Sequence, residues 1–405
     1  MLVAAIVAAC QGTVTPSGSA TVAPVSPRPG SSAASASAGP SKAPGTADLF
    51  GTRYAAKAGP DGGSIVIGDV REANQFHPYF VTEDSDARVA SAAWSTLVLH
   101  TPDDRYLPDL ATGIPTLGNG VDVPGEAGDA MTVHWTLRPN LKWSDGEPLT
   151  CDDMKYAWEW VNDPQNVGVS QGGFENIKAF ECASATDMTW HFDRVYAGYL
   201  TLLTAPLPRH YLAAIPMSDQ TAGAGFRAAE LAKIPVSGPF MFESATPGGE
   251  LRMVRNANYA GPASGKPAHL GRLTWRWFAD AKSLIAGYRN GDVDVATGLR
   301  DVDAASAANL AKQVSTIPSL AYELLRPNWS PTTCSTSVAV AGRGPGCPIS
   351  DPAIRRAVQL TISRNDLNER LYGGALEVTD GNVPRTSWFF AGPPALVFDP
   401  AKARA

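Results

Sequence analysis

The sequence has little charge and none of the common enzyme motifs. Charged residues make up 18% of its 405 residues and the formal net charge is −6, which indicates neither a nucleic-acid partner nor an anionic membrane surface. No apolar run approaches the about 18 residues that a transmembrane helix needs. The six histidines are scattered without an HExxH zinc motif, and no GxSxG nucleophile elbow occurs. We therefore predict a protein that is not an enzyme, with no cofactor and no bound metal.

Cysteine is also scarce, and the number of cysteines is informative. If Cys10 is set aside, four remain: Cys151, Cys182, Cys334 and Cys347. An even number in an exported protein indicates structural disulfides, for which three pairings are possible. We favour Cys151–Cys182 and Cys334–Cys347, because each pair closes a local loop. Zinc is the alternative ligand, but there is no CxxC pair and no histidine at ligand spacing.

The first 61 residues differ in composition from the rest. Residues 1–10 are apolar and end in small residues before Cys10, and Val7–Cys10 resembles a bacterial lipobox, in which the cysteine is lipidated. A secretory signal normally has a basic start and a longer apolar core, so the alternative is a trimmed or misassigned start. Residues 11–61 are mostly Ser, Ala, Thr, Gly, Pro and Val up to position 47. Such a segment cannot bury enough apolar surface to offset its ordering entropy, so we expect a flexible tether.

Residues 131–162 predict a strand, a tight turn and a capped helix in succession. Apolar and polar residues alternate from Met131 to Leu137, the pattern of a strand with one buried face. Ser144–Gly146 has the composition of a turn. Thr150 stands three residues before Asp153, which resembles a capping box. The apolar stripe of the helix is expected at Met154, Ala157, Trp158 and Val161.

Further strands and helices alternate along the chain, as in an α/β protein. Strands are expected at 64–70, at 270–278 and in a hairpin within 233–261, and residues 187–204 indicate a strand and then a helix. Later helices are expected at 283–291, from Pro352 behind an Asp351 cap, and after an Asn365 cap up to Gly373 and Gly374. The buried stripe of the Pro352 helix is expected at Ile354, Ala357, Val358, Thr361 and Ile362.

Four segments together resemble one protein family. Residues 137–164 read LRPNLKWSDGEPLTCDDMKYAWEWVNDP, which resembles the signature of the extracellular solute-binding proteins of family 5, the peptide, dipeptide and nickel receptors of ABC importers. Residues 236–267, 284–299 and 350–375 resemble later segments of the same family in the same order. The four matches are spread over most of residues 62–405.

The resemblance implies an α/β fold of the periplasmic-binding-protein-like type II, class C, in which two α/β lobes carry an additional inserted domain. It places lobe I at 62–92 and 200–320, the inserted domain at 93–199, and an incomplete lobe II/III at 321–405. Relatives continue for well over a hundred residues beyond this point, so the resemblance implies a chain truncated at its C-terminus.

The resemblance also assigns ligand contacts to a loop near the first strand. Thr82, Glu83 and Asp84 fall where relatives place backbone and acidic contacts to a peptide. The alternative is that Glu83, Asp84 and Asp86 form the solvated acidic start of a helix. The residues alone leave both interpretations open.

Other candidate contacts lie further along the chain. Alignment with a peptide-binding relative places Ser170 where that relative has a tyrosine that reaches the ligand. Asn328 matches a residue near a polar contact in relatives, although asparagine at a strand end is also ordinary turn chemistry. Trp329 and Trp388 lie on irregular segments and are candidates for packing against a ligand.

The function implied by the resemblance is solute capture. The lobes close over a solute, a peptide first of all, and a monomeric receptor presents it to an ABC permease and its ATPase. A lipid on Cys10 would hold the protein on the extracytoplasmic side of the cell membrane, in the periplasm or at the cell surface. The alternatives are nickel, an oligosaccharide or another solute, a sensory lipoprotein without transport, and a hydrolase, for which no nucleophile–base pair is found.

Overall fold

The computed structural model has an α/β fold. It describes residues 59–81, 83–101, 105–166, 172–202, 205–216, 219–220, 226, 230–261, 268–299, 351–372, 374, 378 and 397–404. The proposed anchor at Cys10 and almost all of the proposed tether therefore lie outside the described residues. No helix in these ranges is long and apolar enough to span a bilayer.

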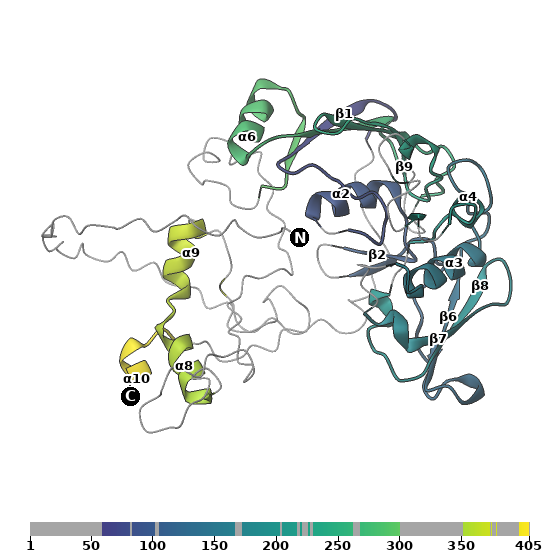
Figure 1. The fold of residues 1–405 in the computed structure, drawn as a ribbon, viewed down its shortest axis with the longest axis horizontal. Coiled ribbons are helices and arrows are strands. Elements are labelled where there is room, and N and C mark those ends of the chain that lie inside the picture. Colours follow the sequence, from purple (N-terminus) through teal and green to yellow (C-terminus); the bar gives the residue numbers. More distant parts are fainter. Residues whose placement is uncertain are drawn as a thin grey trace, which may run out of the picture. The chain divides into compact units, whose positions relative to one another are not determined.

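A mixed five-stranded sheet contains the first strand of the described chain (Figure 1). Its order is β12-β1-β11-β10-β9, with the bounds β1 Ser64–Asp69, β9 Phe240–Ala245, β10 Glu250–Arg255, β11 Arg272–Trp277 and β12 Val295–Thr297. β1 pairs in parallel with β11 and with β12. β10 pairs antiparallel with β9 and β11, which confirms the hairpin predicted within 233–261.

Two helices accompany this sheet, α2 (Asp84–Ala93) and α6 (Ala281–Asn290). α6 packs against β1 so closely that a Cβ atom on Gly68 would lie 2.4 Å from Leu284 Cδ1. A side chain at position 68 would therefore require Leu284 to shift. α6 ends at Gly291 in the left-handed conformation (φ 80°), as its sequence predicted.

A second five-stranded sheet lies between residues 116 and 192 (Figure 1). Its order is β4-β5-β6-β8-β7, with the bounds β4 Thr116–Leu117, β5 Gly120–Asp122, β6 Met131–Thr136, β7 Ile177–Cys182 and β8 Asp187–Phe192. A separate pair is formed by β2 (Val98–His100) and β3 (Tyr106–Pro108). Short helices connect these elements: η1 Glu126–Gly128, η2 Phe174–Asn176, η3 Tyr199–Thr201, α4 Arg209–Leu212 and η4 Leu231–Lys233.

The helix α3 (Cys151–Asn162) packs against the second sheet at β7. Its capping box is confirmed, because Asp153 Oδ2 accepts a hydrogen bond from Thr150 N at 2.9 Å. The predicted stripe was partly wrong: Trp160 is fully buried and Trp158 only partly. α3 is buried over a wider arc than one stripe, because Trp160 also packs on the ring of His77 and donates a hydrogen bond from Nε1 to Gln220 Oε1 at 2.9 Å.

A disulfide joins the first residue of α3 to the last residue of β7. It links Cys151 and Cys182, which confirms this predicted pair. Cys334 and Cys347 lie outside the described residues. The bond ties the helix covalently to the edge strand of the second sheet.

The C-terminal helices are α8 (Pro352–Thr361), α9 (Arg364–Tyr372) and α10 (Pro400–Arg404). The Asp351 cap is confirmed, since its Oδ1 accepts a hydrogen bond from Ala353 N at 2.8 Å. The predicted stripe of α8 was partly wrong: Ile354, Ala357 and Ile362 are half-buried, but Val358 and Thr361 are exposed. The buried residue is Leu360. The reason is that α10 packs against α8, with Asp399 N bonded to Leu360 O.

Two smaller predictions were also wrong. Asn365 lies inside α9, and Ser363 instead accepts a hydrogen bond from Asp366 N at 3.3 Å. After β8, the described residues up to 202 contain only the 3-10 turn η3 where a helix was expected. Serine at the position before Arg364 competes for the cap with the same side-chain chemistry as asparagine.

Candidate functional site

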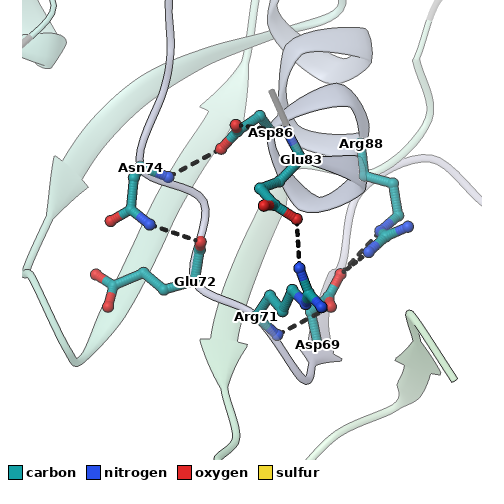
Figure 2. A network of polar contacts seen from close by, with 7 residues as sticks. All are labelled: Asp69, Arg71, Glu72, Asn74, Glu83, Asp86 and Arg88. Carbon is teal, nitrogen blue, oxygen red and sulfur yellow. Dashed lines mark hydrogen bonds and ion pairs between the residues drawn. The ribbon is translucent and has the colours of Figure 1, made fainter. Parts of the chain in front are cut away.

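Three parallel strands of the first sheet end at the same edge. Asp69, the last residue of β1, is in register with Trp277, the last residue of β11, and with Thr297, the last residue of β12. Ligands of α/β sheets bind outside the carboxyl ends of the parallel strands. The candidate site is therefore the polar network at this edge, which continues from Asp69 through the following loop into α2 (Figure 2).

A buried ion pair forms the base of the network. Asp69 is fully buried, and its Oδ2 accepts hydrogen bonds from Arg88, with Nε at 2.8 Å and Nη2 at 2.6 Å. Arg88 lies on α2, so the pair joins the end of β1 to that helix (Figure 2). A buried carboxylate is stable in its charged form only when it is paired in this way.

Gly298 lies directly against this pair. It follows β12, has a positive φ of 73°, and a Cβ atom there would lie 2.4 Å from Asp69 Oδ1 and 3.0 Å from Arg88 Nη2. Only glycine satisfies both the backbone conformation and the space. The chain leaving β12 thus covers the ion pair with backbone alone.

The loop between β1 and α2 is held by Asp86. Asp86 is buried, and its Oδ1 accepts hydrogen bonds from Asn74 N at 2.9 Å and Gln75 N at 3.1 Å. Its Oδ2 accepts from Glu83 N at 3.1 Å, which completes a capping box at the start of α2. The interpretation of Asp86 as a solvated residue was therefore wrong, because it supplies the acceptors that order the loop.

The outer part of the network is an exposed ion pair between Arg71 and Glu83. Arg71 Nη1 lies 2.5 Å from Glu83 Oε2, and the two side chains are 66% and 48% exposed. Figure 2 shows both side chains reaching toward each other from the loop and from the start of α2. Exposed pairs of this kind contribute little to stability, so both groups can change partners at small cost.

A buried histidine lies in the same loop. His77 stacks on Trp160 with ring centroids 4.2 Å apart, and its Nδ1 accepts a hydrogen bond from Tyr79 N at 3.2 Å. Burial lowers the pKa of His77 to about 3. The ring is therefore neutral at physiological pH and acts as a packing residue between the loop and α3.

The structure places two of the predicted contact residues at this edge. Glu83 caps α2 and Asp84 is its first residue, as expected of an acidic helix start. Their contact with a ligand stays a prediction. The other predicted contacts lie outside the described residues: Thr82, Ser170, Asn328, Trp329 and Trp388.

Sequence reasoning missed Asp69, Arg71, Arg88 and Gly298. The available signals were an aspartate at the end of an apolar strand and a glycine that directly follows β12. Neither signal indicates its partner, because Asp69 contacts Arg88 on the next helix and Gly298 far along the chain, and no spacing rule joins these positions. The assembled network places a buried ion pair, Asp69–Arg88, beside an exposed one, Arg71–Glu83.

Comparison with known proteins identifies related sequences and folds. The sequence model described as "Bacterial extracellular solute-binding proteins, family 5 Middle" matches residues 105–405. A probable monoacyl phosphatidylinositol tetramannoside-binding protein, LpqW, of Mycobacterium tuberculosis is 31% identical over 255 residues, which are 60% of this chain and 36% of that protein. A probable di/tripeptide-binding protein of Pseudomonas aeruginosa is 25% identical over 71% of this chain and 55% of its own length.

Among solved structures, the fold is similar to that of the oligopeptide-binding protein AppA from Bacillus subtilis in complex with a nonapeptide. The TM-score is 0.64 at 20% identity, over 85% of this chain and 63% of that chain. The chain spans between about a third and about half of the length of the two curated relatives.

Proposed function

Because this chain belongs to the bacterial extracellular solute-binding proteins of family 5, we propose that it is the solute-binding component of an ABC importer and that its solute is a peptide. The family consists of non-enzymatic solute-binding proteins that act outside the cytoplasm. The observation that carries the proposal is the match of this family to residues 105–405, almost three quarters of the chain.

Two relatives support a peptide as the solute. The Pseudomonas relative is described as a probable di/tripeptide-binding protein, and AppA was solved with a nonapeptide. A peptide carries a positive and a negative terminus, and the network at the carboxyl edge of the first sheet contains an exposed cation and an exposed anion. The chemistry of the solute thus matches the chemistry of the site.

We assign the exchangeable role to the pair Arg71–Glu83. A bound peptide would take over the two charges, with its carboxylate on Arg71 and its ammonium group on Glu83, while the buried pair Asp69–Arg88 keeps the loop in place. The cost of separating the exposed pair is small because both side chains are already solvated. The charged contacts of the peptide would therefore replace the Arg71–Glu83 ion pair, which itself contributes little to stability.

The remaining parts of the proposal concern the whole protein. Two lobes, with the inserted domain at 93–199, would close over the peptide because the closed state makes more contacts with it. A lipid on Cys10 and the tether that follows would hold the receptor near an ABC permease and its ATPase. The receptor acts as a monomer in this scheme.

A second candidate solute is a glycolipid headgroup. It is favoured by the relative with 31% identity, whose description is a probable monoacyl phosphatidylinositol tetramannoside-binding protein. A sugar headgroup carries hydroxyl groups rather than a charged amino terminus, so it would not need Glu83. The two solutes can therefore be separated by variants of the charged pair.

The test is a thermal-shift screen of the 405-residue chain against tri- to pentapeptides, the same peptides acetylated and amidated, nickel chloride, and a phosphatidylinositol mannoside. A ligand that binds only the folded state raises the melting temperature. We expect free peptides to raise it, blocked peptides to raise it less, and R71A and E83Q to reduce the effect.

The matched control is R194A, because Arg194 and Asp193 form a pair of similar exposure, at 67% and 44%, in another part of the fold. If the melting temperature rises only with the phosphatidylinositol mannoside, the solute is a glycolipid and the proposed peptide is wrong. No shift with any probe would contradict solute binding by this chain. A peptide shift that is unchanged in R71A and E83Q would overturn the assigned contacts while leaving the function in place.

A further inference from the structure

The outer edge of the second sheet carries a cluster of metal-ligating side chains. Asp122 ends β5, Glu126 begins η1, and His134 lies on β6, and one ligand atom from each lies within 4.8 Å of the others. We propose that these three side chains bind a divalent first-row transition-metal cation, with zinc as the probe. The site belongs to a different sheet from the proposed solute site and does not depend on the proposed function.

The orientation of His134 favours a metal over a simple hydrogen bond. His134 Nδ1 lies 3.0 Å from Thr189 Oγ1 on the neighbouring strand β8, which fixes the ring and directs Nε2 toward the carboxylates. Nε2 is 3.5 Å from Asp122 Oδ2 and 3.8 Å from Glu126 Oε1. These separations exceed a normal hydrogen bond but are close to the about 3.4 Å between ligands of a tetrahedral metal with bonds of about 2.1 Å.

No basic side chain among the described residues balances the charges of the cluster. Within the described ranges, Asp122 and Glu126 have His134 as their ion-pair partner and no lysine or arginine. The nearby Asp129 differs, because Lys178 and His191 both bind it and lower its pKa. Two carboxylates beside one imidazole therefore form a site with an excess of negative charge, which a dication would balance.

An independent observation on the same face is the buried hydroxyl of Thr132. Thr132 is fully buried, and its Oγ1 has no hydrogen-bond partner among the residues that the structure describes. Thr132 is directly across the ladder from Asp122 and two residues before His134, so its side chain lies on the same sheet face as theirs. Such hydroxyl groups are normally bonded, so the sheet face that carries the cluster also carries a buried polar group without a partner among the described residues.

The donor set indicates which cations fit. One imidazole and two carboxylates form a mixed nitrogen and oxygen set, which suits zinc and neighbouring transition metals, whereas magnesium and calcium prefer oxygen alone. Thr189 has the role of an outer hydrogen-bond partner that orients a ligating histidine. A bound cation would connect η1 to β6 and so fasten the segment between β5 and β6 onto the sheet.

The test is isothermal titration calorimetry of the untagged, oxidised 405-residue chain with zinc chloride and with magnesium chloride. We expect one zinc ion bound per chain through His134, and no comparable heat with magnesium. H134A and D122N should each weaken zinc binding at least tenfold, and T189V about tenfold, since loss of an outer partner typically costs 10- to 100-fold. Circular dichroism would verify that each variant is folded.

The matched control is H210A. His210 is similarly exposed, but its Nε2 lies 2.9 Å from Asp145 Oδ2, a direct hydrogen bond that leaves no room for a cation. Its removal should leave zinc binding unchanged. X-ray absorption of the zinc complex should show only nitrogen and oxygen ligands. Zinc binding that is absent, that is equal in H134A, or that shows sulfur ligands from cysteine would overturn the proposal.

Discussion

Ser144 and Val236 are joined by two hydrogen bonds. Ser144 N donates to Val236 O at 3.0 Å, and Val236 N donates to Ser144 Oγ at 3.0 Å. Asn258 adds a third bond, from its side-chain nitrogen to Ser144 O at 3.0 Å. These residues belong to two of the segments that carry the family resemblance, 137–164 and 236–267. Ser144, Val236 and Asn258 therefore hold these two segments against each other. They are separate from the charged network between Asp69 and Arg88.

Replacement of Ser144 by alanine should destabilise the fold. S144A removes the acceptor of the Val236 N–H, and Val236 is fully buried, so that donor loses its partner. The expected loss is about 1–2 kcal/mol in the free energy of unfolding, measured by urea denaturation. The control is S91A, because the hydrogen bond from Ser91 Oγ to Arg88 O lies at an exposed position. Equal stability of S144A and S91A would contradict the structural role.

The buried pair at the carboxyl edge of β1 should be far more sensitive than the exposed pair beside it. R88A leaves the carboxylate of Asp69 buried without its cation, which we expect to cost about 3–5 kcal/mol. R71A removes an exposed pair and should cost less than about 1 kcal/mol. Chemical denaturation of the two variants measures both values, and a loss in R88A no larger than in R71A would show that the pair does not stabilise the loop.

His77 should make the fold less stable in acid. Its pKa is about 3 in the folded state and 6.5 for an unperturbed histidine side chain, so below pH 6.5 the unfolded chain binds a proton that the folded chain does not. The contribution of neutral, buried His77 to the free energy of unfolding is therefore fully present above pH 6.5. Below that pH it falls by at most about 1.4 kcal/mol per pH unit until about pH 3.

The variant H77N tests this sign. Asparagine can keep an acceptor for Tyr79 N but does not titrate. Urea denaturation at pH 7, 6, 5 and 4 should show a smaller loss of stability in H77N than in the unchanged protein. Parallel curves for the two proteins would mean that His77 is not buried in its neutral form.

The disulfide between Cys151 and Cys182 should contribute several kilocalories per mole. It closes a loop with a sequence separation of 31 residues, for which chain entropy predicts about 3–4 kcal/mol. The double variant C151S/C182S should lose that amount in thermal or urea denaturation under oxidising conditions. A loss that persists unchanged when both proteins are reduced would contradict a role for the bond itself.

Local features of the fold could be predicted from the sequence. The Thr150 cap, the β9–β10 hairpin and the Gly291 helix end each depend on residues within a few positions of one another. The Cys151–Cys182 pair was found for a similar reason, because the shorter loops between cysteines were favoured. Local chemistry of this kind is visible in a single sequence.

Contacts between distant residues could not be predicted in the same way. Asp69 meets Arg88 across 19 positions and Gly298 across more than 200, and no spacing rule joins them. The wrong choice of Trp158 over Trp160 has a related cause, since a single apolar stripe does not anticipate that Gln220 and His77 bury a second face of α3. The proposed metal cluster was missed because its ligands come from β5, η1 and β6 without a motif spacing.

The most direct test of the account measures binding and chemistry together. Isothermal titration calorimetry of the 405-residue chain with a free tri- to pentapeptide that raises its melting temperature should show saturable binding of one peptide per chain. Mass spectrometry of the same sample should recover the peptide intact after prolonged incubation. A peptide that is cleaved, or a chain that binds none of the peptides in the screen, would contradict the conclusion that this protein captures and releases a peptide unchanged.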